Sequence, residues 1–75
     1  MNYGPYWIVE RKLKSGGTVL VGLSNGGPIY TQHGYEMRLS NSGSADAFRS
    51  YAEQRLSVLE GQEGKLFITL VKPHT

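Results

Sequence analysis

The stretch Leu66-Phe67-Ile68-Thr69-Leu70-Val71, near the end of a chain of 75 residues, decides the fold. Successive side chains of a strand point to opposite faces, so its residues divide into two alternating sets. Both sets are apolar, which is typical of a strand that is central in its sheet or covered on both faces. We therefore expect this segment to be a strand inside a sheet.

A helix is expected immediately before this strand, over residues 45–60. Phe48, Ala52, Leu56 and Leu59 recur at spacings of four, four and three, which makes one apolar stripe. Ser44 is suited to cap the first amides of the helix. Gly61 is suited to the position that follows its last turn.

The first half of the chain reads as a series of short strands. Residues 6–14 are rich in aromatic and β-branched residues, and residues 18–23 alternate after the turn Ser15-Gly16-Gly17. Residues 35–40 also alternate between apolar and polar side chains, which predicts a further strand. Whether residues 29–31 form a short strand is left open. The prediction is an α+β fold: a three- to four-stranded antiparallel sheet with one helix packed on one face, in the order β-β-(β)-β-α-β.

The length allows a single small domain, expected to span residues 1–75 with flexible ends at 1–5 and 73–75. Doubly wound and barrel enzyme folds need a longer chain. The longest apolar run has six residues, from Leu66 to Val71, whereas a membrane span needs about 20. The N-terminus does not have the pattern of a signal peptide, so a soluble intracellular protein without membrane contact is expected.

One helix of about 15 residues is ~22 Å long and covers only one face of such a sheet. Two interpretations of the second face remain open. Tyr3, Tyr6 and Leu20 close over Phe67 and Val71 as a minor core, or the apolar face stays exposed and binds a partner.

Catalytic, metal and cofactor sites are not expected. The two histidines, His33 and His74, lie in a predicted loop and in the tail, and the chain has no cysteine. The Gly-rich segment 22–27 is not followed by Lys-Ser or Lys-Thr, as a phosphate loop would be. Glu10 and Glu36 could act as a carboxyl pair only if the strand register placed them side by side, and exposed strand faces commonly carry such residues. Because none of these motifs is specific, we expect the protein not to be an enzyme.

Nucleic-acid binding is an open alternative. Tyrosines and Phe67 are interleaved with basic residues on the predicted sheet, and bases stack on such aromatic side chains. However, the net charge is only +2. The cluster Arg11, Lys12 and Lys14 is also interpretable as a solvated hairpin end that protects an edge strand from aggregation.

The order of short motifs resembles that of small proteins encoded by phages and prophages. The matching segments are Gly22-Leu23-Ser24, Pro28-Ile29-Tyr30-Thr31, Met37-Arg38-Leu39-Ser40 and Ala45-Asp46-Ala47-Phe48, after the first strand Trp7-Ile8-Val9. This resemblance covers residues 6–59. It implies a host-takeover factor or an anti-CRISPR-like inhibitor, which binds a host protein or ribonucleoprotein complex in the cytoplasm of a bacterium.

The leading hypothesis is therefore a small protein-binding module that inhibits a host complex, such as a CRISPR effector, by occluding its surface. A single-stranded nucleic-acid-binding module and a structural homodimer are the alternatives. Trp7 and Phe48 are assigned to the core. The expected partner-binding residues are Tyr6, Arg11, Lys12, Tyr30, His33, Tyr35, Arg38 and Phe67.

Overall fold

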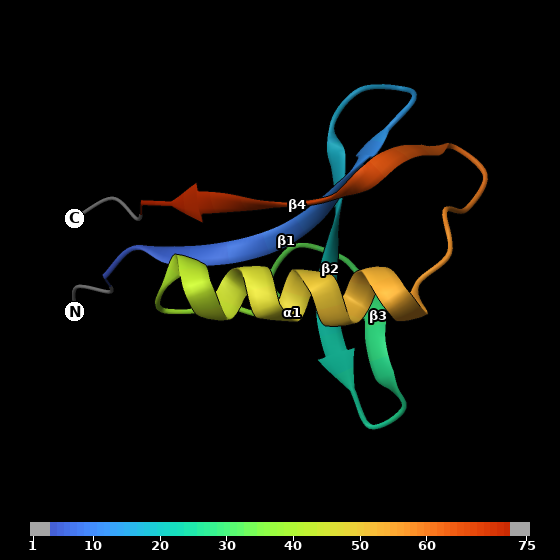
Figure 1. Ribbon diagram of the computed structural model, residues 1–75. Helices are drawn as coiled ribbons and strands as arrows, with labels where there is room; N and C mark the ends of the chain where they lie inside the picture. The colour runs from blue at the N-terminus through green and yellow to red at the C-terminus, as the bar shows by residue number, and fades with distance from the viewer. Residues whose placement is uncertain (1–3, 73–75) are drawn as a thin grey trace.

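The computed structural model describes residues 4–72, in which four strands form one antiparallel sheet and a single helix packs on it (Figure 1). This confirms the predicted α+β class. The predictions for Tyr3, His74 and the outermost ends lie outside the described residues. The elements are β1 (Tyr6–Leu13), β2 (Thr18–Ser24), β3 (Gly27–Thr31), α1 (Ser42–Arg55) and β4 (Gln62–Val71).

The strands lie in the order β3-β2-β1-β4. Gly16 and Gly17 have positive φ angles of 98° and 76°, which let the chain turn tightly from β1 into β2. A second tight turn follows β2, where Ser24 lies opposite Gly27 in the register. The segment that the sequence left open, 29–31, thus belongs to β3.

β4 lies at the edge of the sheet and pairs only with β1 among the described strands. Of the two expectations, a central strand or a strand covered on both faces, the first is therefore wrong. An apolar pattern on both faces does not require two neighbouring strands, because it arises equally from a helix on one face and loops or open surface on the other.

Residues 35–40 do not form the predicted strand. Only Leu39 makes a bridge, to Trp7, with N···O distances of 2.7 and 2.9 Å. Residues 32–41, which we call the strap, cross the sheet face opposite α1 instead. The strap passes so close to Gly22 that a Cβ atom there would lie 2.6 Å from the carbonyl oxygen of Tyr35.

The helix begins and ends earlier than predicted. Asn41 is its N-cap, and the Asn41 side chain accepts a hydrogen bond of 2.7 Å from the amide of Ser44. The sequence predicts Ser44 itself as the N-cap. At the other end the chain becomes extended at Leu56. Leu59 is consequently outside the helix and 52% exposed, and Gly61 lies in the turn before β4 instead of at a helix end.

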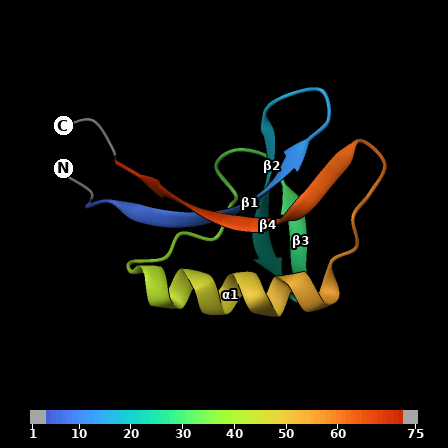
Figure 2. The ribbon, with the colours of Figure 1, turned by 45° about the horizontal axis from the view of Figure 1, so that its top comes forward.

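The core lies between α1 and the sheet, which Figure 2 shows on one side of the helix. Phe48 packs against it as predicted, while Trp7 is half-buried. Val9, Val21, Ala52 and Leu66 form its centre, with Tyr30, Phe48, Leu56 and Ile68 packed around them.

Substitution of Gly22 by alanine should destabilise the protein by about 1–3 kcal/mol, because the added methyl group would push against the strap backbone. Chemical denaturation followed by Trp7 fluorescence would measure this. Gly26→Ala is the control, since its nearest neighbour would be Ser24 Oγ at 3.9 Å. Equal stability of the two variants would contradict the strap's position over Gly22.

Candidate functional site

The predicted partner-binding residues do not form one surface. Arg11 and Tyr30 take part in the internal structure, and Tyr6 is paired with Arg38 of the strap. The remaining side chains are exposed on three elements, the strap, β1 and β4. These remaining residues are Lys12, His33, Tyr35 and Phe67.

Arg11 is completely buried, so its expected exposure at a solvated or partner-binding surface is wrong. Its Nε donates to the Tyr30 hydroxyl at 3.0 Å, and its Nη2 donates to Glu53 Oε2 at 3.3 Å. Its Nη1 donates to the carbonyl oxygen of Gly64. The guanidinium group therefore connects β1 with β3, α1 and β4.

Two other atoms complete this network. The Tyr30 hydroxyl donates to the carbonyl oxygen of Ser57 at 2.6 Å, just beyond α1. Glu53 Oε1 accepts from the amide of Leu66 at 2.9 Å. The polar atoms of Tyr30 and Arg11 are thus occupied inside the protein. The alternation of Arg11 with Val9 on one strand face is the sequence signal that could have revealed this role.

Glu36 is the centre of a second polar group, in the strap. Its side chain is 2% exposed and accepts hydrogen bonds of 2.9 Å from the amide of Gly34 and from Arg38 Nε, while His33 Nδ1 lies 3.7 Å away. Burial opposes ionisation of Glu36, but these hydrogen bonds and the nearby positive charges outweigh it and lower the pKa. The bond to Glu36 raises the pKa of Arg38.

Arg38 also lies over the ring of Tyr6, with 4.7 Å from the guanidinium carbon to the ring centre. The pair is therefore held by contacts within the protein, and Tyr6 is half-buried. Tyr35 is 77% exposed and the His33 side chain 89% exposed, so both are accessible. Lys12 is exposed as well.

The second face of the sheet is covered in part, and the covering element is the strap, whereas the first interpretation named the aromatic N-terminal residues and Leu20. Ile8 and Glu10 are buried on this face, where the strap crosses β2 beside them. Phe67, opposite Glu10 in the register, remains 38% exposed. On the helix side of the same strand, Leu70 is also 38% exposed. The end of β4 is thus apolar and incompletely covered on both faces.

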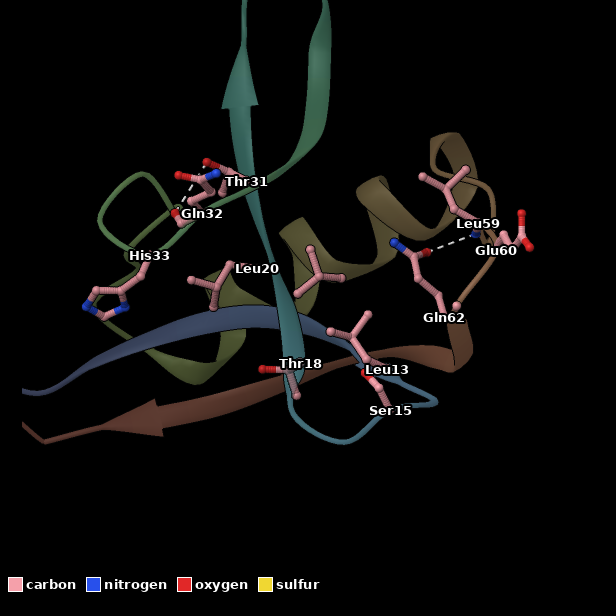
Figure 3. Close-up of a pocket in the computed structure, with 12 residues that line it drawn as sticks. Leu13, Ser15, Thr18, Leu20, Thr31, Gln32, His33, Leu59, Glu60 and Gln62 are labelled. Carbon is pink, nitrogen blue, oxygen red and sulfur yellow. Dashed lines mark hydrogen bonds between the residues drawn. The ribbon is translucent and has the colours of Figure 1, made fainter.

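An open groove of about 710 Å³ lies along β2, between the strap and the turn that precedes β4 (Figure 3). His33 lies at one end and Glu60 at the other, and Figure 3 shows both side chains directed away from the middle. Gln62 accepts a hydrogen bond of 2.9 Å from the amide of Leu59. The groove therefore does not bring together an acid, a base and a nucleophile.

Within residues 4–72, no group of three or more His, Asp or Glu side chains is arranged to hold a metal ion. Glu10 and Glu36 are engaged with different partners: Thr18 donates its hydroxyl hydrogen to Glu10, and Glu36 binds within the strap. The described part of the chain also contains no helix with the length and apolar character of a membrane span.

Comparison with known proteins found no matching family model, no matching curated protein and no matching solved structure. The resemblance to phage accessory proteins therefore stays a prediction from sequence motifs.

Replacement of Glu53 should separate the two roles of its carboxylate. Glu53→Ala should lower the free energy of unfolding by about 3 kcal/mol, because it leaves the buried Arg11 unpaired. Glu53→Gln should cost less, about 2 kcal/mol, since its single amide oxygen still accepts from the Leu66 amide although Arg11 loses its counter-charge. Urea denaturation measures both, with Lys12→Ala as an exposed control. Equal, small losses for the two variants would argue against the network.

Glu36 should make stability fall in acid. Its folded-state pKa lies below the ordinary 4.5, so its stabilisation is fully present above that value and is lost as the pH falls through the lower, folded pKa. Glu36→Gln should therefore lose less stability than the original protein between neutral pH and about pH 3, a range set by ordinary carboxyl values. Denaturation midpoints across this range test the expectation, and parallel curves would refute it.

Proposed function

We propose that this protein is a small, non-enzymatic protein-binding module that acts by covering a surface of a larger partner. The observation that carries the proposal is the incompletely covered apolar end of β4, where Phe67 and Leu70 are each 38% exposed. The two side chains lie on opposite faces of the strand, so a partner that touches both would have to bind at its edge. Aromatic side chains such as Phe67 are also enriched in protein interfaces.

The electrostatic surroundings favour a protein over a nucleic acid as the partner. Nucleic-acid modules need basic groups that are free to neutralise phosphates. Arg11 is instead buried against Glu53, and Arg38 is paired with Glu36. The acidic side chain of Glu10 lies beside Phe67 on the same face of the sheet, next to where a base stacked on Phe67 would lie. This arrangement disfavours base stacking on the sheet.

The inhibitor role is the finer part of the proposal. It comes from the motif resemblance over residues 6–59, which implies a bacterial host complex, such as a CRISPR effector, as the target. A module without a catalytic group inhibits by occupying a surface that its target needs. A few anchors would supply most of the binding energy, as in other interfaces.

Site-specific photo-crosslinking tests the proposal in the organism that produces the protein. A photoreactive phenylalanine analogue at position 67 should give one or a few discrete protein adducts, because this side chain lies at the proposed interface. The same analogue at position 23 is the control, since Leu23 is 51% exposed but lies at the far end of β2.

Adducts to protein at position 67 and not at position 23 would support the assignment. Nucleic-acid adducts at position 67, or equal labelling at both positions, would contradict it. Adducts between two copies of this chain would instead favour the structural homodimer.

A further inference from the structure

The backbone of β4 has a free edge whose orientation follows from the hydrogen bonds of β1. Both backbone groups of Trp7 bond to Leu39, at 2.7 and 2.9 Å, on the side of β1 away from β4. Leu70 lies opposite Trp7 and is therefore a non-hydrogen-bonded partner. Its N–H and C=O consequently point away from the sheet. By alternation, the same holds for Ile68, which lies opposite Val9.

These groups have no hydrogen-bond partner among residues 4–72. Two residues earlier, the edge is closed, because the Leu66 amide bonds to Glu53 at 2.9 Å. Figures 1 and 2 show no other described element along the last part of β4 on the side away from β1. As far as residues 4–72 are concerned, the free edge of β4, residues 68–71, is therefore open to an added strand.

The opposite edge of the sheet, β3, is protected against pairing with another strand. β3 has only five residues, and Pro28 cannot donate a hydrogen bond from its nitrogen. β4 has ten residues, with neither a proline nor a charged residue from Leu66 to Val71. An edge strand without such protection pairs readily with another strand.

Two exposed lysines flank the free edge. Lys65 precedes the apolar run and Lys72 follows it. Neither lysine takes part in an ion pair within the described part of the chain. An incoming strand with acidic residues around an apolar centre would complement these charges at both ends.

We propose that the free edge of β4 binds an extended segment of a partner protein by strand addition, and that this segment has an apolar centre flanked by acidic residues. The backbone groups of Ile68 and Leu70 would bond to the added strand, and Phe67 and Leu70 would contact its side chains on the two faces. This inference rests on the proposed protein-binding function and names the chemistry of the partner.

A second copy of this chain fits the edge less well. In a two-fold antiparallel pairing, residues whose backbone groups face outward lie opposite each other. Three registers are then possible: Ile68 opposite Ile68 of the second copy, Leu70 opposite Leu70, or Ile68 opposite Leu70. Lys72 would then lie opposite Ile68, Leu66 or Gly64 and never opposite an acid. Self-pairing would thus leave the flanking charges unmatched.

Two synthetic peptides provide the test. One has the sequence Asp-Asp-Ile-Thr-Val-Thr-Val-Asp-Asp, and the other carries lysine in place of each aspartate. The labelled protein is titrated with each peptide, and amide chemical shifts are followed by NMR. The acidic peptide should shift the amides of Ile68 and Leu70 and bind about tenfold more tightly at low salt, as expected for several exposed ion pairs.

Variants of the edge separate backbone pairing from side-chain contact. Leu70→Pro removes an outward N–H and should weaken the acidic peptide about fivefold relative to Leu70→Ala, which keeps it. The double variant Lys65→Glu, Lys72→Glu should reverse the preference for the acidic peptide. This double variant lies at exposed positions and remains informative if Leu70→Pro does not fold.

Binding of neither peptide, shifts at other amides, or equal binding of both would overturn the inference. Peptide-independent shifts that grow with protein concentration would assign the edge to a second copy instead. If position 67 crosslinks to protein but neither peptide binds the β4 edge, the proposed function would stand and only strand addition would be rejected.

Discussion

The buried guanidinium of Arg11 is the constraint on which the rest of the structure depends. A buried charge costs several kcal/mol unless it is paired and hydrogen-bonded. Arg11 meets this condition only when Tyr30 of β3, Glu53 of α1 and Gly64 of β4 are all in place. Because Glu53 also holds the Leu66 amide, one acid positions the helix against both the cation and the edge strand. Four elements are therefore located by a single polar network.

The surface that remains for binding follows from this arrangement. The network holds α1 against β1 and the beginning of β4, and the strap crosses the other face beside Gly22. Neither layer covers the end of β4 completely, and Phe67 and Leu70 stay 38% exposed there. The basic residues that would have suggested a nucleic-acid surface are partly used inside the fold. One accessible feature is thus an apolar strand edge between two lysines.

Much of the fold was predictable because short-range rules determine it. The paired glycines at 16 and 17 predict the first hairpin, and the stripe that includes Phe48 and Ala52 predicts the helix. The start of the helix was missed because Asn41 and Ser44 are both good caps, and only the folded chain selects between them. Residues 35–40 were mistaken for a strand because the polar residues Glu36 and Arg38 alternate with apolar ones, although the two bind each other within the strap.

The candidate site was harder to predict than the fold. Local alternation identified the apolar character of β4, but it cannot distinguish a central strand from an edge strand, since both have the same side-chain pattern. The amino-acid sequence by itself determined the α+β class, the hairpin turns and the apolar run of β4. Only the tertiary structure decided that Arg11 is buried and that the end of β4 is free. These properties depend on partners 19 to 53 residues away, whose contact requires the folded chain.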